Sequence, residues 1–231
     1  KRPVMKILLI TFTPYQTVQM QIAAITSYLR HNGIEVSYCE YYIFTGESFK
    51  KHQEQVQKDI FREQPDIVGF STYDMNYHYT LDCARFIKKL DSNIKTIAGG
   101  HTASVAPFEF MQYDYIDFVG KGEGEETLKE LAHALENDVP LNEIKGLYWK
   151  NHAGEVATNE ARPLIEALDE LPFIPTSLFK KFDLKSVSLS NIIRKLVSSG
   201  TSSAYPSKIY LDKYNSQNQI KALNSIISTI L

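Results

Sequence analysis

The chain of 231 residues is 43% hydrophobic and carries 25 basic against 27 acidic residues, for a formal net charge of −2. That length suffices for one good core plus an appendage, and the scattered, balanced charge argues against nucleic acid or an anionic membrane as a partner. Two cysteines, Cys39 and Cys83, cannot build a disulfide framework; with no membrane-length apolar run and no signal-peptide pattern, we expect a cytoplasmic protein.

Strands and helices alternate through the first part of the chain. The nearly continuous apolar run 4–12 predicts a strand buried on both faces, and 16–32 predicts an amphipathic helix stopped by Gly33. The pattern continues with strands at 35–42, 67–71, 95–98 and 115–119 and helices at 49–64, 76–90 and 123–136. This alternation predicts an α/β, flavodoxin-like (Rossmann-like) doubly wound parallel sheet of five strands in the order 2-1-3-4-5.

The pattern changes beyond Pro140. Two short strand patterns, 146–150 and 155–159, flank a turn and predict a small β-hairpin. A proline-punctuated stretch, 168–175, predicts the exit from the domain. The serine-rich end contains two helical patterns, at 190–198 and 217–230. We therefore predict three parts: an α/β domain over 1–140, a hairpin and linker over 141–175, and a partly helical appendage over 176–231.

Ligands of doubly wound sheets bind outside the carboxyl ends of the strands, near the point where strand order reverses. The loop after the first strand, from Thr11 to Thr13 onward, lacks both the acidic residues of a phosphoacceptor receiver and the Gly-x-Gly-x-x-Gly of a dinucleotide site. Small and polar residues instead follow the third, fourth and fifth strands: Ser71, Thr72, Tyr73, Gly99, Gly100, His101, Gly120, Gly122 and Gly124. Three bare loops predict a broad recess for a large, flat ligand, although the paired glycines alone also suit a turn.

In these features the sequence resembles the cobalamin-binding domain that precedes the catalytic barrel in many radical S-adenosylmethionine (SAM) enzymes. The stretches that carry the resemblance are PDIVGFSTYDMN (65–76), IAGGHTAS (97–104), YDYIDFVGKGEGEETLKEL (113–131), IKGLYWK (144–150) and ALDELPFIP (167–175). Related corrinoid domains separate a Ser-x-Leu signature and a Gly-Gly pair by a similar interval to the 25 residues found here between Tyr73 and Gly99.

The resemblance implies roles for individual residues. The nucleotide tail of cobalamin would pass between sheet and helices over Gly99 and Gly100, and Ser71 would offer a hydroxyl to the tail base or its linker. Gly122 and Gly124 would let the loop approach the tail, with helix N–H groups facing the linker phosphate. Glu123 belongs to this loop, although its carboxylate, like that of Glu125, is better explained by the helix dipole. His101 is expected at the rim rather than on cobalt.

The resemblance has one departure at the cobalt. Corrinoid proteins that ligate cobalt through histidine carry Asp-x-His-x-x-Gly after the first strand, where this chain has Thr13, Pro14, Tyr15, Gln16, Thr17 and Val18. Cobalamin is therefore expected base-off without a protein imidazole, and Tyr15, Tyr73 or water is left to face the metal.

A second departure concerns the catalytic half. A radical SAM domain needs Cys-x-x-x-Cys-x-x-Cys to hold a four-iron four-sulfur cluster, and no cysteine follows Pro175. The cluster and SAM are thus expected only with a missing catalytic half or a separate radical SAM subunit. Methyl transfer or related radical chemistry is the favoured function. A non-catalytic corrinoid-binding or regulatory module remains an alternative, and flavin mononucleotide binding on the same fold is a weaker one.

Overall fold

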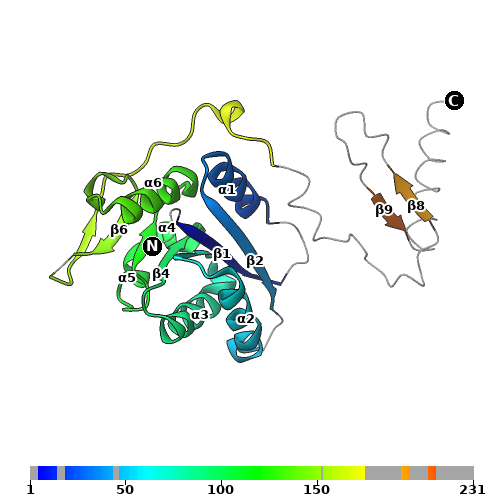
Figure 1. The fold of residues 1–231 in the computed structure, drawn as a ribbon, viewed down its shortest axis with the longest axis horizontal. Helices are drawn as coiled ribbons and strands as arrows, with labels where there is room; N and C mark the ends of the chain where they lie inside the picture. Colours follow the sequence, from blue (N-terminus) through cyan, green and yellow to red (C-terminus); the bar gives the residue numbers. More distant parts are fainter. Residues whose placement is uncertain are drawn as a thin grey trace. The chain divides into compact units, whose positions relative to one another are not determined.

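The computed structural model describes residues 5–14, 19–43, 47–151 and 153–174, and two short strands at 194–197 and 208–211. Contacts divide the chain into two compact units, Lys1–Pro175 and Thr176–Leu231. The first unit contains the sheet and all the helices of Figure 1 that carry labels. The candidate site lies entirely in this unit.

Five parallel strands form the centre of the sheet in the predicted order 2-1-3-4-5. They are β1 (Lys6–Thr13), β2 (Glu35–Tyr42), β3 (Ile67–Ser71), β4 (Lys95–Gly99) and β5 (Phe118–Gly120). The register places Ser71 beside Gly99 and Ala98 beside Val119. The carboxyl ends of β3, β4 and β5 therefore meet at one edge, as the sequence predicts.

The sheet has seven strands rather than five, because the predicted hairpin joins it. Strands β6 (Leu147–Lys150) and β7 (Val156–Thr158) are antiparallel, and β6 pairs with β5 through Val119 and Tyr148. A strand at the edge of a sheet has backbone N–H and C=O groups without hydrogen-bond partners. The hairpin supplies these partners for β5. The hairpin is thus an extension of the sheet.

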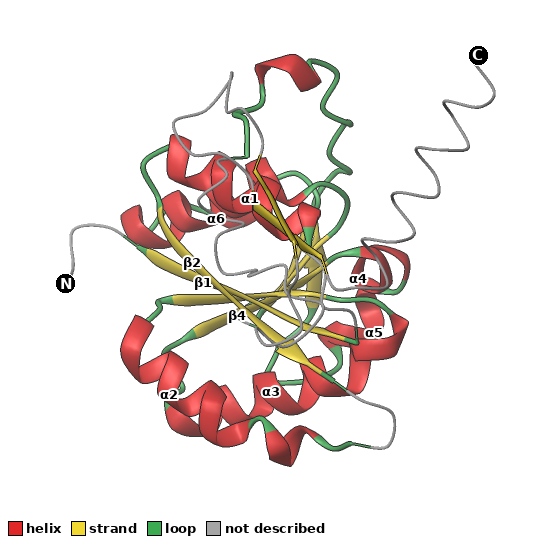
Figure 2. Cartoon of the chain, turned by 90° about the vertical axis from the view of Figure 1, so that its right-hand side faces the viewer, coloured by secondary structure: helices red, strands yellow, loops and turns green. Residues whose placement is uncertain are grey.

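Helices cover both faces of the sheet (Figure 2). Two helices lie on one face, α1 (Met20–His31) and α6 (Gly124–Asn137), and four on the other, α2 (Gln53–Glu63), α3 (Tyr77–Leu90), α4 (His101–Val105) and α5 (Pro107–Met111). Short 3₁₀ turns lie at Phe49–Lys51, Asp74–Asn76, Leu141–Glu143 and Leu168–Glu170. Because helices pack on both sides, successive residues of β1 such as Leu8 and Leu9 are buried in different clusters, which explains its unbroken apolar run.

Some boundaries differ from the sequence prediction. The helix α1 begins at Met20 instead of residue 16, and β5 is only three residues long because Tyr113 to Ile116 form a turn, in which the Ile116 N–H donates to the Tyr113 carbonyl at 3.2 Å. The helices α4 and α5 were not predicted, since their five-residue lengths are too short for apolar periodicity to appear.

The second unit contains a two-stranded antiparallel ladder of β8 (Arg194–Val197) and β9 (Lys208–Leu211). The predicted helix at 190–198 is therefore wrong, because the backbone of its central residues pairs with β9. The predicted helix at 217–230 lies outside the described residues. Among the helices that the structure describes, none is both long and apolar enough to cross a membrane.

Candidate functional site

A cavity of about 240 Å³ lies at the carboxyl ends of β3, β4 and β5, between the sheet and the helices α1 and α6. We call it the edge cavity. Its lining residues are Leu9, Gln21, Ile22, Ile25, Gly69, Phe70, Ser71, Ile97, Gly99, Gly100, Gly120, Gly122, Glu123, Gly124, Glu125, Thr127 and Leu128. The predicted site residues Ser71, Gly99, Gly100, Gly120, Gly122, Glu123 and Gly124 all belong to this lining.

Gly99 and Gly120 leave the sheet side of the edge cavity without side chains, although neither local packing nor backbone conformation requires glycine there. An added Cβ would lie no closer than 3.8 Å to a neighbour at Gly99 and 3.6 Å at Gly120, which is ordinary van der Waals contact. Neither residue has a positive φ. Because the protein's own packing does not require glycine at either position, these two residues favour the ligand interpretation over the turn.

Gly100 is explained by the turn itself. It has a φ of +91°, and a Cβ there would lie 2.7 Å from the carbonyl oxygen of Thr72. The two glycines of the pair therefore differ: Gly100 permits the turn, whereas Gly99 borders the edge cavity.

Thr72 stabilises this turn through hydrogen bonds to its backbone. Its buried Oγ1 donates to the Gly99 carbonyl at 2.6 Å and accepts from the Ala103 N–H at 3.2 Å. The Thr72 N–H also donates to the Gly99 carbonyl at 2.8 Å. Thr72 was predicted to bind the cofactor, but the structure places it beneath the turn and outside the cavity lining.

Ser71 presents its hydroxyl at the edge cavity without a protein partner among the described residues, while its carbonyl accepts from Asn76 Nδ2 at 3.0 Å. Asn76 is fully buried and donates from the same nitrogen to the Phe12 carbonyl at 3.0 Å. It joins the ends of β1 and β3 and so holds Ser71 in place. In the sequence prediction Asn76 is only the first residue of the helix 76–90 and has no part in the site.

Three of the remaining predicted residues, Thr13, Tyr73 and His101, are described by the structure. The Tyr73 hydroxyl donates to the Phe12 carbonyl at 2.6 Å, which ties this ring to the end of β1. Thr13 is buried and accepts from Gln19 at 3.3 Å, and His101 is exposed as the first residue of α4. None of these three lines the cavity. Tyr15 lies outside the described residues.

The first turn of α6 forms the outer wall of the edge cavity and is acidic. Burial raises the pKa of the Glu125 carboxyl, the backbone N–H groups of Glu125 and Gly124 oppose this, and the nearby charge of Glu123 raises the pKa further. Glu123 itself accepts from the Ile165 N–H at 2.7 Å. The Glu125 carboxyl is thus close enough to these N–H groups for them to lower its pKa, and they are the groups expected to face a phosphate.

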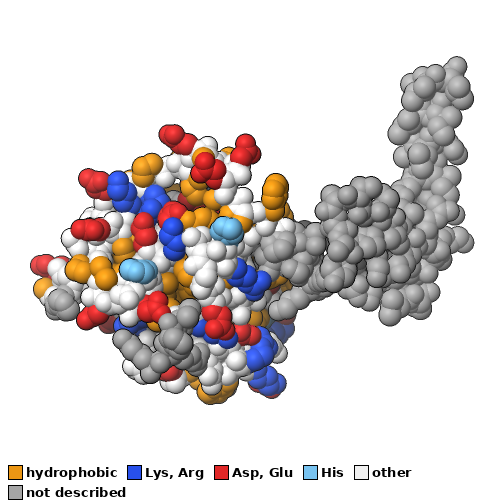
Figure 3. Space-filling view, turned by 45° about the horizontal axis from the view of Figure 1, so that its top comes forward, with side chains coloured by type: hydrophobic (Ala, Val, Ile, Leu, Met, Phe, Trp, Pro, Cys, Tyr) orange, Lys and Arg blue, Asp and Glu red, His pale blue; other side chains and the backbone are white. Residues whose placement is uncertain are grey.

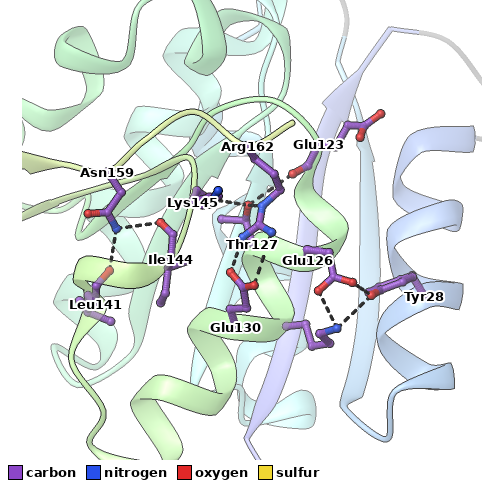
Figure 4. A network of polar contacts seen from close by, with 11 residues as sticks. Tyr28, Glu123, Glu126, Thr127, Glu130, Leu141, Ile144, Lys145, Asn159 and Arg162 are labelled. Carbon is purple, nitrogen blue, oxygen red and sulfur yellow. Dashed lines mark hydrogen bonds and ion pairs between the residues drawn. The ribbon is translucent and has the colours of Figure 1, made fainter. Parts of the chain in front are cut away.

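A polar cluster fixes α6 against α1 beside this wall (Figure 4). Glu126 accepts from the Tyr28 hydroxyl and pairs with Lys129 at 2.6 Å. Burial acts to raise the pKa of Glu126, but the hydrogen bonds from Lys129 and Tyr28 outweigh it and lower that pKa overall. The two helices that flank the edge cavity are thereby held at a fixed separation.

The described residues form neither a patch of one charge on the face shown in Figure 3 nor a cluster of metal ligands. On the face shown in Figure 3, acidic and basic side chains are interspersed, in keeping with the net charge of −2. Within the described ranges, no group of three or more His, Cys, Asp or Glu side chains could hold a metal ion. No histidine is among the residues that line the edge cavity.

Two curated relatives match about half of the chain. An uncharacterized methyltransferase of Pyrococcus horikoshii is 34% identical over 118 residues, which are 51% of this chain and 26% of that protein. The cobalamin-dependent radical SAM methyltransferase TokK of Streptomyces tokunonensis is 30% identical over 108 residues, 46% of this chain and 16% of that protein. The chain thus spans about a quarter or less of the length of these relatives.

Two solved structures share the fold. The cobalamin-dependent S-adenosylmethionine radical enzyme OxsB aligns with a TM-score of 0.62 at 20% identity, over 77% of this chain and 25% of that one. The radical S-adenosylmethionine methyltransferase TsrM from Kitasatospora setae, solved with cobalamin and an iron–sulfur cluster bound, aligns with a TM-score of 0.52 at 19% identity, over 73% and 31%. The model of the B12 binding domain matches residues 6–132, more than half of the chain, and the chain therefore belongs to the B12-binding domain family.

Proposed function

We propose that this chain binds cobalamin, with the nucleotide tail of the cofactor in the edge cavity. The observation that carries the proposal is the bare sheet wall at Gly99 and Gly120, where nothing in the protein itself requires glycine. Side-chain-free backbone lets another body lie directly against the main chain. The relatives support the same assignment, since several bear names or titles that refer to cobalamin.

The chemistry of the lining suits a tail that is apolar with a few polar atoms. The side chains of Ile22, Ile25 and Leu128 offer aliphatic surface to a planar base. Ser71 supplies a hydroxyl that no described residue engages, and a buried polar atom of the ligand needs such a partner.

We further propose that cobalamin is held base-off and without a protein imidazole. This is supported by the absence of histidine from the edge-cavity lining and from the stretch Thr13 to Val18. Bound cobalamin supplies a cobalt centre that can be reduced and can carry a methyl group. The residues named above bind and orient the tail; none of them is assigned a part in bond making.

We also propose that the chain works as the cofactor-binding part of a cobalamin-dependent radical SAM enzyme that transfers a methyl group. The similarity to TokK and to the methyltransferase of Pyrococcus horikoshii supports this assignment. The cysteines needed for the iron–sulfur cluster would belong to another segment or subunit. Iron and sulfide added to this chain should therefore give no four-iron cluster, and formation of a stable cluster would contradict the assignment.

The cofactor proposal is tested by mixing the protein with hydroxocobalamin, desalting it, and recording the visible spectrum. We expect retention of one corrinoid per chain with a base-off spectrum. A base-on or histidine-ligated spectrum would contradict the ligation, and retention of flavin instead of corrinoid would overturn the assignment.

A matched pair of variants ties retention to the cavity. Gly120→Val fills the edge cavity and should abolish retention, whereas Ala157→Val makes a similar addition on β7, away from the cavity, and should retain the cofactor. Equal retention by both variants would show that the tail does not enter the edge cavity.

A further inference from the structure

Residues 159–165, which we call the strap, run from the end of β7 back along α6 (Figure 4). The strap is anchored at its start, where Asn159 Nδ2 donates to the carbonyls of Leu141 and Ile144 at 2.7 Å each. The Gly146 N–H donates to the Glu160 carbonyl at 2.7 Å. The strap is therefore a fixed part of the first unit and not a loose connection.

Arg162 carries the main side-chain contact of the strap with α6. Its Nε donates to Thr127 Oγ1 at 3.1 Å, and its guanidinium pairs with Glu130. The Arg162 side chain is 11% exposed, against 38% for Glu130. A cation so nearly buried is costly unless it is fully paired, and this pairing determines where the guanidinium must lie.

Thr127 connects Arg162 to the edge cavity. Its hydroxyl lies 3.4 Å from the Glu123 carbonyl and 3.3 Å from the Lys145 carbonyl, while its Cγ2 methyl lies 3.7 Å from where a Cβ on Gly120 would be. A helical threonine has two accessible rotamers. The hydrogen bond from Arg162 Nε favours the Thr127 rotamer in which the hydroxyl faces the strap and the methyl group faces the wall of the edge cavity.

A second contact of the strap reaches the same wall. The Ile165 N–H donates to Glu123 Oε2 at 2.7 Å, and Glu123 lines the edge cavity directly before α6 begins. Two strap residues thus contact two lining residues at the start of α6, Glu123 just before the helix and Thr127 within it, although Arg162 and Ile165 do not line the edge cavity themselves.

We propose that Arg162 is a positioning residue for the cofactor tail. Through Thr127, and together with the Ile165 contact to Glu123, it fixes the wall of the edge cavity so that the nucleotide tail of a complete corrinoid is retained. The inference rests on the proposed function, because it concerns the same cavity. It adds that a residue outside the ligand contact surface sets the preference for a corrinoid with a tail.

The test compares cobalamin with cobinamide, a corrinoid that lacks the nucleotide tail. Dissociation constants of both are measured by titration in the full chain, for the wild type and for Arg162→Ala, Arg162→Lys and Glu130→Gln. Arg162→Ala should weaken cobalamin binding about tenfold, from loss of hydrogen bonds to a charged group, and change cobinamide binding less than about twofold. Arg162→Lys should restore part of the difference, since an ammonium can pair with Glu130 but cannot replace both contacts of the guanidinium.

Glu130→Gln is the second variant, for the case that Arg162→Ala does not fold. It weakens the ion pair but keeps the guanidinium, and Glu130 is the more exposed of the two partners. Lys58→Ala, which removes an exposed ion pair with Glu54 on α2, is the matched control and should leave both affinities unchanged. Free energies of unfolding without corrinoid are measured alongside, since a merely structural role would lower stability but leave the ratio of the two affinities unaltered.

The outcomes separate the two proposals. If the wild type binds neither corrinoid, the proposed function fails. If the wild type prefers cobalamin and the Arg162 and Glu130 variants keep the same ratio, the role of the strap is refuted while the proposed function stands.

Discussion

The Oγ1 of Thr72, directly after β3, donates a 2.6 Å hydrogen bond to the carbonyl of Gly99, the last residue of β4. The same oxygen accepts from the Ala103 N–H, so one buried hydroxyl joins two strand ends and the helix α4. The shape of the edge cavity at Gly99 depends on this junction.

Thr72→Val tests the junction. The variant keeps the shape of the side chain but leaves the Ala103 N–H without its hydroxyl partner, and the unfolding free energy should fall by about 1–3 kcal/mol. Urea denaturation followed by circular dichroism measures it, with the exposed Thr158→Val as control. A fall no larger than that of the control would contradict the role given to Thr72.

The two glycines of the pair should respond differently to alanine. Gly100→Ala must place a Cβ 2.7 Å from the Thr72 carbonyl oxygen, and its backbone at φ +91° and ψ −169° is a conformation that essentially only glycine adopts, which alone costs about 1–3 kcal/mol. Gly99→Ala makes only ordinary contacts and should change the unfolding free energy by less than about 1 kcal/mol. Thermal unfolding of both variants decides the point, and equal destabilisation would show that Gly99 is also required by the fold.

Ser71→Ala should separate binding from stability. The hydroxyl engages no described residue, so the unfolding free energy should stay close to that of the wild type. If the hydroxyl serves the cofactor tail, the affinity for cobalamin should fall about fivefold, which is the usual contribution of one neutral hydrogen bond. The exposed Ser92→Ala is the control in the same titration, and an unchanged affinity for Ser71→Ala would remove this serine from the site.

Neighbouring glutamates should affect the pH dependence of stability with opposite signs. The pKa of Glu125 is raised above 4.5 by burial, so its ionisation costs stability at high pH, and that cost disappears as pH falls below 4.5. Glu125→Gln should therefore stabilise the protein at neutral pH and have no such effect at low pH. The pKa of Glu126 is lowered, so its contribution is present above 4.5 and is lost as pH falls through its folded-state pKa.

Glu126→Gln is the matched variant and should destabilise the protein at neutral pH, with the difference vanishing in acid. Chemical denaturation of both variants across the acidic to neutral range gives the two curves. Curves of the same sign would contradict the environments that the structure gives to these two carboxyls.

The alternation of elements could be predicted because it depends on local composition. The apolar run of β1 and the amphipathic period of α6 each indicate their own structure, and five such strands with helical connections leave few arrangements. The carboxyl-edge location of the site follows from that topology. The hairpin's place in the sheet could not be predicted, because it depends on which edge of β5 is left unpaired. The helix predicted at 190–198 failed because its central residues pair with β9 across ten intervening positions.

The sequence by itself determined the fold class, the strand order and the bare loops at the ends of β3, β4 and β5, since these depend on hydrophobic period and on glycine. Only the tertiary structure distinguished Gly99 from Gly100, moved Thr72 beneath the turn, and brought Arg162 to Thr127. The physical reason is that the space around an atom, and the hydrogen bond that a buried donor finds, are set by residues distant in the chain that packing brings together.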